Sequence, residues 1–415
     1  MIKNLIIAVV LLVTITGYSQ EGGTASPYSF YGIGTQQFKG TAENRSMGGL
    51  STYGDSLHLN IVNPAALGKL RFVTFAVGGS QSERNLKDAT SENSVSTTTI
   101  DYIALGFPVS RRLGMSFGLM PYTAVGYKID NGTETAFNRF SGKGGLNRVF
   151  LGAGYRVAKG FNIGINANYN FGNIQNESLR TQDDVELGTR EKNRSDLSGL
   201  TFDIAAQYQA KLNEKLTLYS SAVYVPGSNV SSENTRQISS VLFNTLGLVQ
   251  DLDVRDIDVA DTDFEFPSSV TLGLGVGQAN KWFLGAEYTQ QKSSNFTNRT
   301  FTLDNVVFED ANQIRLGGFY IPKYNSVTSY WQKVNYRAGF RYEESGIVIQ
   351  NEAINEFGIS FGLGLPAGRL FSNANVGLEY GQRGTTNANL VEETFLNVYL
   401  SLSLNDIWFQ KTKFN

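Results

Sequence analysis

One stretch of this chain concentrates residue types that bind metal ions. It contains seven carboxylates: Asp251, Asp253, Asp256, Asp258, Asp261, Asp263 and Glu265. Clustered carboxylate oxygens are ligands that Ca²⁺ prefers. The spacing does not match an EF-hand loop, and Arg255 interrupts the run. We therefore expect a solvated acidic loop that could also meet a partner protein, and the first four carboxylates remain a weak candidate for a metal site.

The residue types that carry out nucleophilic and redox chemistry are scarce in this chain. The chain has no cysteine and one histidine, His58, which excludes disulfides, thiol nucleophiles and metal sites made of several His or Cys residues. A Ser/His/Asp triad could be written around His58, but no Gly-x-Ser-x-Gly motif accompanies it. A hydrogen-bonded structural histidine is favoured. Because nucleotide-binding motifs are also missing, we predict a protein that is not an enzyme and uses no cofactor.

Five charged residues lie in segments where polar and apolar residues alternate. They are Asp203, Glu287, Arg337, Arg341 and Glu379. Asp203 sits between apolar neighbours, as does Glu379. Such charges need a partner when they are enclosed. We expect them to form ion pairs that hold an internal segment in place, and the two arginines could alternatively hold a ligand carboxylate.

Alternation of this kind defines most of the chain. Residues 161–171 read Phe-Asn-Ile-Gly-Ile-Asn-Ala-Asn-Tyr-Asn-Phe, which in a strand gives one apolar and one polar face. We count 14 such runs, each suited to a tilted strand that crosses a bilayer. They are Leu70–Gly79, Thr97–Phe107, Leu113–Ala124, Asn147–Ala158, Phe161–Asn173, Ser198–Ala210, Lys215–Pro226, Phe266–Gly277, Lys281–Gln290, Asn312–Ile321, Val334–Glu343, Asn355–Gly364, Ala374–Gln382 and Phe395–Leu404.

The polar faces indicate which side of the sheet faces water. A soluble sandwich also alternates, with its apolar side buried. A closed sheet of 14 strands, however, has a lumen too wide for one layer of side chains, and its polar residues suit a wet interior. The fold class predicted is therefore all-β, a 14-stranded antiparallel transmembrane barrel whose apolar face meets lipid. The net charge of −2 argues against a nucleic-acid partner.

The chain divides into three parts. Residues 1–19 have the charge, apolar stretch and small residues of a secretory signal peptide. Residues 20–69 do not alternate, and their apolar side chains favour a plug folded into the lumen over a loose tail. Residues 70–415 form the barrel. Together these features predict an integral protein of a Gram-negative outer membrane.

The lengths of the connections between runs support a barrel in the outer membrane. Outer-membrane barrels have short periplasmic turns and longer outer loops. The outward connections predicted as loops include Ser80–Ser96, Val125–Leu146, Ile174–Leu197 and Gly227–Glu265, whereas several inward connections are only a few residues long.

A short motif precedes the first strand. Asn63-Pro64-Ala65, in a signal-bearing chain with 14 predicted strands, resembles the FadL family of outer-membrane transport proteins. The resemblance implies an N-terminal hatch that plugs the lumen, hydrophobic ligands such as long-chain fatty acids, and a sideways exit at a kink in the third strand. Pro121 lies in the third run and is the candidate for that kink. An ordinary strand end is the alternative for Pro121.

Other details resemble the Bacteroidota-type branch of that family, among them Phe107-Pro108 and residues 358–366. That resemblance implies that some members are subunits of secretion or assembly complexes. The leading hypothesis is passive uptake of a hydrophobic small molecule, with outer-membrane lipid as surroundings. The alternative is a structural subunit of an outer-membrane protein assembly or secretion complex that binds other envelope proteins.

Overall fold

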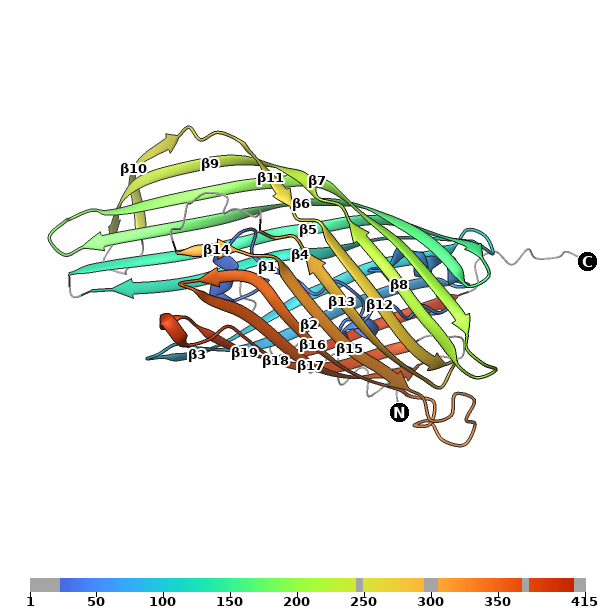
Figure 1. Ribbon diagram of the computed structural model, residues 1–415. Coiled ribbons are helices and arrows are strands. Elements are labelled where there is room, and N and C mark those ends of the chain that lie inside the picture. Colours follow the sequence, from blue (N-terminus) through green and yellow to red (C-terminus); the bar gives the residue numbers. More distant parts are fainter. Residues whose placement is uncertain (1–22, 134, 244–248, 295–304, 368–372, 407–415) are drawn as a thin grey trace, which may run out of the picture.

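A computed structural model describes residues 23–133, 135–243, 249–294, 305–367 and 373–406. The predicted signal peptide lies outside the described residues. The chain forms a closed antiparallel β-barrel of 14 strands, as the alternation predicted (Figure 1). No helix among the described residues is long and apolar enough to cross a membrane.

The elements follow one another in a simple order. The N-terminal segment, residues 23–72, contains η1 (Pro27–Phe30), β1 (Thr35–Gln36), α2 (Ala42–Arg45) and η2 (Pro64–Lys69). The wall then contains β2 (Val73–Lys87), β3 (Glu92–Pro108), β4 (Leu113–Gly132), β5 (Ala136–Ala158), β6 (Phe161–Gln182), β7 (Gly188–Lys211), β8 (Thr217–Val225), β9 (Ser228–Phe243), β10 (Val249–Ile257), β11 (Thr262–Phe266), β12 (Ser269–Gln278), β13 (Trp282–Gln291), β14 (Val306–Phe308), β15 (Ala311–Tyr320), β16 (Asn335–Ile349), β17 (Glu352–Pro366), β18 (Asn373–Arg383) and β19 (Glu392–Asp406), with η3 (Asn387–Asn389) in the last connection.

The last strand closes the barrel against the first. β19 pairs with β2 from Glu392 opposite Lys87 to Asp406 opposite Val73. The ring of 14 consists of β2–β8, β12, β13 and β15–β19, in which β8 pairs with β12, β13 pairs with β15, and every other strand pairs antiparallel with the next one in sequence. The remaining strands extend its outer end: β9 pairs with β7, β10 and β11, and β14 pairs with β16. A closed sheet leaves no edge inside the bilayer, where an unpaired backbone group has no water to bind.

The two faces of the wall have the polarity that the sequence predicted. In β6, the Ile165 side chain is 47% exposed on the outside, whereas Asn166 is 2% exposed and faces inward. The same contrast recurs around the barrel, where large apolar side chains such as Leu284, Phe361 and Leu404 are exposed. Since a wide apolar outer surface needs lipid around it, the protein is an integral outer-membrane barrel rather than a soluble sandwich.

The wall is much taller on one side. β5, β6 and β7 have 23, 22 and 24 residues, about 75–80 Å of strand, whereas β12, β13 and β15 have 10 residues each, about 33 Å. A bilayer needs only about 9–11 residues per strand. The long strands therefore project well beyond the membrane at the end away from the short turns (Figure 1). We call this projecting part of β4–β7 and β9 the tall wall.

The prediction of long outer loops is wrong for four connections. Residues 80–96, 125–146, 174–197 and 227–265 are mostly strand, in β2–β7 and β9–β11. Outside the bilayer a strand has water on both faces, so its residues need not alternate in polarity. Ion pairs such as Arg194–Asp196 at 2.7 Å and Arg236–Glu191 at 2.8 Å occur there instead.

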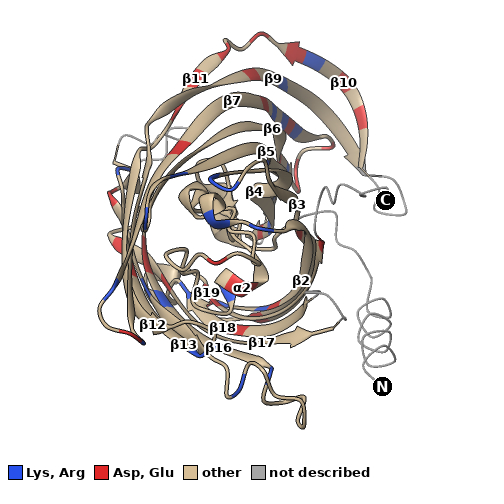
Figure 2. Cartoon of the chain, turned by 90° about the vertical axis from the view of Figure 1, so that its right-hand side faces the viewer, with Lys and Arg blue, Asp and Glu red and all other residues tan. Residues whose placement is uncertain are grey.

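The N-terminal segment lies within the ring of strands (Figure 2). α2 contacts β17, β18 and β19, whereas η2 contacts β3 to β7 on the other side. Leu50, Leu67 and Leu70 of this segment are fully buried. Its apolar residues thus bury against inward-facing side chains of the wall.

Candidate functional site

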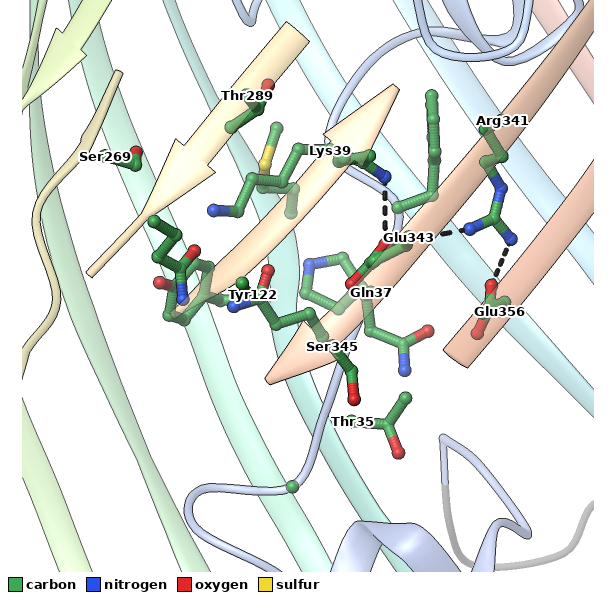
Figure 3. Close-up of a pocket in the computed structure, with 18 of the residues that line it drawn as sticks. Thr35, Gln37, Lys39, Tyr122, Ser269, Thr289, Arg341, Glu343, Ser345 and Glu356 are labelled. Atoms are coloured by element: carbon green, nitrogen blue, oxygen red, sulfur yellow. Dashed lines mark hydrogen bonds and ion pairs between the residues drawn. The ribbon is translucent and has the colours of Figure 1, made fainter. Parts of the chain in front are cut away.

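A cavity of about 320 Å³ lies in the lumen between the N-terminal segment and the wall. Gln37 and Lys39 approach it from the N-terminal segment, and Tyr122, Arg341 and Glu343 approach it from β4 and β16 (Figure 3). Apolar side chains complete the lining, among them Met120, Phe150, Val223 and Phe266. The cavity therefore offers both charged groups and apolar surface to a ligand.

The wall is broken beside this cavity. β3 pairs with β4 only from Pro108 opposite Gly114 to Ile103 opposite Leu119. Beyond that point β3 stays paired with β2 as far as Lys87 and Glu92, and β4 stays paired with β5 as far as Gly132 and Phe137. The two strands therefore separate in the described residues toward the outer end.

Pro121 lies where the separation begins. The β4–β5 register shifts between Pro121 and Thr123, so β4 is irregular there. Proline has no N–H for a ladder hydrogen bond and favours such irregularities. The cavity is lined by Thr97, Thr99 and Asp101 of β3 as well as by Pro121, so both sides of the break face it.

The N-terminal segment takes the place that β3 leaves. β1 pairs antiparallel with β4, with Thr35 opposite Ala124 and Gln36 opposite Thr123. The N–H of Gln37 donates to the Tyr122 carbonyl at 3.0 Å. Part of the β4 backbone that the break exposes is thus paired with the N-terminal segment rather than with the wall.

Two cations flank the ring of Tyr122. The Lys39 Nζ lies 4.7 Å from the ring centroid, and the Arg148 guanidinium lies 4.0 Å from it. The Arg148 Nε also donates to Asn170 Oδ1 at 2.8 Å, which fixes its direction. An aromatic ring that two cations contact is a favourable electrostatic arrangement, and it places positive charge beside the cavity.

Buried ion pairs join the opposite side of the N-terminal segment to the wall. The Arg45 Nε donates to Glu379 Oε2 at 2.8 Å, and the Arg341 Nε donates to Glu379 Oε1 at 2.7 Å. Arg341 also pairs with Glu356, which pairs in turn with Arg383. We call this set the charge network. Since each carboxylate meets two guanidinium groups, the charges are compensated within the lumen.

A second carboxylate holds the following stretch of the segment. Glu287 Oε1 accepts hydrogen bonds from the N–H groups of Ser51 and Thr52, each at 2.6 Å, and from the Thr52 hydroxyl at 2.6 Å. Arg315 lies 3.4 Å from the other oxygen. A buried carboxylate with several donors is strongly bound to them.

The remaining two charged residues expected in the lumen also face inward. Asp203 accepts from Asn166 at 3.3 Å and Asn168 at 3.1 Å. Arg337 donates to Asn375 at 2.9 Å, and the Asn375 amide donates to Glu43 at 2.9 Å. These two residues therefore bind amides, whereas Glu379 and Glu287 bind the N-terminal segment directly.

Several residues of the charge network were missed from sequence. Arg45 belongs to a segment without periodicity, so its partner could not be inferred. Glu356 and Arg383 of the network, and the neighbouring ion pair of Arg84 with Glu393 at 2.8 Å, do lie on inward positions of strands. They lie near the outer ends of the strands, where polar and apolar residues no longer alternate, so the sequence pattern did not assign them to the inner face.

The Asn63-Pro64-Ala65 motif begins η2. The Asn63 side chain accepts the Ala65 N–H at 3.2 Å and caps the helix, and Pro64 occupies a first-turn position that needs no N–H. A Cβ at Gly164 would lie 2.3 Å from the Pro64 carbonyl carbon, and one at Gly154 would lie 2.3 Å from its oxygen. Glycines in β5 and β6 thus let the motif lie directly on the wall.

His58 is held by a near neighbour. Its Nδ1 lies 2.5 Å from Asp55 Oδ2, while the N–H groups of Leu57 and His58 donate to Asp55 Oδ1 at 2.8 and 2.7 Å. Burial opposes both charges, but the pairing raises the pKa of His58 and holds the pKa of Asp55 at about 2. This arrangement is a structural ion pair.

The acidic stretch lies on β10, β11 and their connection. Asp251 pairs with Arg190 and Lys192, and Asp253 pairs with Arg255 at 3.0 Å. Asp256 accepts from Gln237 at 3.1 Å. In the described part of the chain, no group of three or more His, Cys, Asp or Glu residues could hold a metal ion.

Comparison with known proteins gives a family and a fold. A family model described as BamG matches residues 1–415. No curated protein matches the chain. The structure of the Pseudomonas putida toluene transporter TodX matches with 16% identity and a TM-score of 0.59, covering 90% of this chain and 99% of that one.

Two further solved structures have the same fold. A Pseudomonas aeruginosa FadL homologue matches with 11% identity and a TM-score of 0.57, covering 91% of this chain and all of that one (100%). A TodX deltaS2S3 mutant, described as a monoaromatic hydrocarbon channel, matches with 17% identity and a TM-score of 0.57, covering 88% of this chain and 99% of that one. The expected FadL-like barrel fold is confirmed, although the matching family model has a different name.

Proposed function

The chain belongs to the BamG family, and from that premise we propose that it is an outer-membrane channel for hydrophobic small molecules. The break between β3 and β4 beside a partly apolar lumen cavity is the observation that carries this proposal. A hydrophobic molecule that leaves through such a break enters the bilayer directly and avoids the water beyond the barrel.

The proposed path begins at the outer end of the barrel. The molecule reaches the cavity at Tyr122 and contacts Met120 and Phe150. It leaves past Pro121 when β1 moves away from β4. In this proposal the N-terminal segment acts as the hatch, and Asn63, Pro64 and Ala65 fix its far end on the wall.

The ligand class follows from the lining and from the neighbours. TodX is titled a toluene transporter and a monoaromatic hydrocarbon channel, which supports apolar ligands. Lys39 and Arg148 would also attract a carboxylate. Long-chain fatty acids therefore remain a candidate beside uncharged hydrocarbons.

A disulfide that locks β1 tests this path, because the chain contains no cysteine of its own. Gln36→Cys with Thr123→Cys places two thiols on opposed residues of β1 and β4. Uptake of radiolabelled toluene and of a radiolabelled long-chain fatty acid is measured in cells that lack other hydrophobic channels. Oxidation should abolish uptake, and reduction should restore it.

The matched control places a disulfide where no movement is proposed. Thr189→Cys with Ser240→Cys joins opposed residues of β7 and β9 that do not line the cavity. Uptake through this variant should be the same when oxidised and reduced. If the β1–β4 variant took up the ligand equally well when oxidised and when reduced, exit through the break would be contradicted.

The free edge of β10 favours a second candidate function. β10 pairs only with β9 among the described residues, and Leu252, Val254 and Ile257 are exposed on it. An unpaired edge outside the membrane accepts a strand from another protein. The second proposal is therefore a structural subunit of an outer-membrane assembly or secretion complex.

Purification in mild detergent separates the two candidates. A stoichiometric set of other envelope proteins that is lost from a Val254→Pro variant would favour the subunit. A barrel purified alone, with bound hydrophobic ligand, would favour the channel.

A further inference from the structure

The lipid-facing wall contains an apolar hollow of about 590 Å³, separate from the lumen. It spans the outer surface of β4 to β8 and reaches β12. Its rim is formed by large side chains: Leu113, Tyr155, Ile163, Ile165, Ile204, Tyr224 and Val270. Its floor includes Ala153, Ala206 and Ala222. We call this feature the wall hollow.

The strand register explains why the surface is recessed there. Leu113, Tyr155, Ile163, Ala206 and Ala222 are opposed in turn across neighbouring strands, so they form one outward row. Two adjacent alanines interrupt this row of large residues. The row above it contains Ile165, Ile204 and Tyr224, which are large again. The missing side-chain volume leaves the hollow.

The hollow lies in the half of the membrane next to the short turns. Tyr155 is near the end of β5 at Ala158, and Ile163 is near the start of β6 at Phe161. Short turns mark the periplasmic end of such barrels. Phospholipid of the periplasmic leaflet is therefore the lipid that meets this surface.

Basic residues border the hollow at that end. Exposed Arg111 and Arg112 directly precede Leu113, and exposed Lys159 lies in the turn between β5 and β6. Lys211 and Lys215 are exposed at the next turn, where Glu214 is the acidic residue. Positive side chains at this depth attract lipid phosphate groups.

We propose that the wall hollow binds one acyl chain of an anionic phospholipid whose phosphate contacts Arg112 and Lys159. The acyl chain occupies a space that the surrounding lipids would fill poorly, because isoleucine and tyrosine side chains enclose this space on both sides. Each methylene placed against the alanine floor adds apolar contact. The proposal is independent of whether the barrel conducts a ligand or binds partner proteins.

Lipid retention by the purified full-length barrel tests the proposal. The protein is equilibrated with phosphatidylglycerol or phosphatidylcholine, washed with detergent and analysed by native mass spectrometry. Wild type should retain one phosphatidylglycerol. The Ala206→Leu/Ala222→Leu variant fills the hollow and should retain about tenfold less, in line with the loss of a few buried methylenes.

Two further variants keep the outcome unambiguous. Ala338→Leu makes one such substitution at an exposed outward position of β16, away from the hollow, and should retain lipid like wild type. Arg112→Gln/Lys159→Gln should lose the preference for phosphatidylglycerol over phosphatidylcholine. Folding of each variant is checked by heat-dependent gel mobility.

Two results would overturn the proposal. One is equal phosphatidylglycerol retention by wild type and the filled variant. The other is an unchanged preference for phosphatidylglycerol in Arg112→Gln/Lys159→Gln, which would rule out the proposed phosphate contacts.

Discussion

The two sides of the N-terminal segment are attached to the barrel by different physical means. On one side, α2 meets the charge network, where Arg45 and Arg341 both bind Glu379. On the other, β1 meets β4 through two opposed residue pairs and a backbone hydrogen bond from Gln37. A buried ion pair is costly to separate because each lost partner leaves a charge without water. A short strand pairing can be exchanged for water near an opening.

The break in the wall occurs on the side that is held by strand pairing and apolar packing rather than by ion pairs. Under the proposed function, the charge network would keep α2 in place when β1 is released. A hatch attached in this way would open without leaving the lumen.

Removing the acid at the centre of the charge network should have the largest effect. Glu379→Gln leaves the Arg45 and Arg341 guanidinium groups without their shared carboxylate. We therefore expect the free energy of unfolding to fall by about 3–5 kcal/mol. Denaturant unfolding followed by gel mobility measures the change. Glu343→Gln is the control, because Glu343 lies 3.9 Å from Arg341 and is more exposed. Equal effects of the two substitutions would contradict a central role of Glu379.

Loosening the β1 side should have a smaller and local effect. Gly34 has a φ of 93°, and a Cβ there would lie 2.5 Å from the Ala124 carbonyl oxygen. Gly34→Ala should therefore displace β1 at a cost of about 1–3 kcal/mol. Hydrogen exchange should become faster at Gln36 and Gln37 while α2 amides stay protected.

Gly227→Ala is the control for that prediction. The nearest atom to a Cβ at Gly227 is 3.4 Å away, so the substitution should leave exchange unchanged. If Gly34→Ala released α2 together with β1, the two sides of the segment would be one unit.

The Asp55–His58 pair predicts how the middle of the segment responds to pH. The pKa of His58 is raised, so its contribution to stability is complete below about pH 6.5 and is lost as the pH rises through the folded value. The pKa of Asp55 is about 2, so its contribution is present above about pH 4 and is lost as the pH falls toward 2. The pair is most stabilising between these limits.

Hydrogen exchange at the Leu57 and His58 amides measures this dependence. Both donate to Asp55, so their protection, corrected for intrinsic rates, should fall as the pH rises above the ordinary histidine pKa of about 6.5 and through the raised pKa of His58. His58→Gln should remove the part of the dependence that comes from the histidine. Burial lowers the pKa of nearby Lys69 to about 7, and any slope that remains in the variant reports that lysine.

The tall wall should be the least sensitive region. Arg139 pairs with Asp130 at 2.7 Å, but both side chains are more than a third exposed. Arg139→Gln should change the stability of the barrel by about 0–1 kcal/mol. A loss comparable to that of Glu379→Gln would show that the tall wall is energetically coupled to the lumen.

Particular residues show why some predictions succeeded. Ile165 and Asn166 were assigned to opposite faces because successive side chains of any strand alternate. Pro121 was singled out because proline lacks a donor and because the resemblance implies a kink in the third strand; it lies where β3 leaves β4, and its role as an exit stays a prediction. In contrast, the partner of Arg45 is 334 residues away, and no local pattern relates the two.

The sequence by itself determined the number of membrane strands, their order and the polarity of each face, because alternation with a period of two is a local property of the backbone. Only the tertiary structure decided how far β5–β7 extend beyond the bilayer, where β3 separates from β4, and which charges hold the N-terminal segment. Those features depend on pairing between distant residues and on water contacting both faces of a strand. Neither produces a periodic pattern in the sequence.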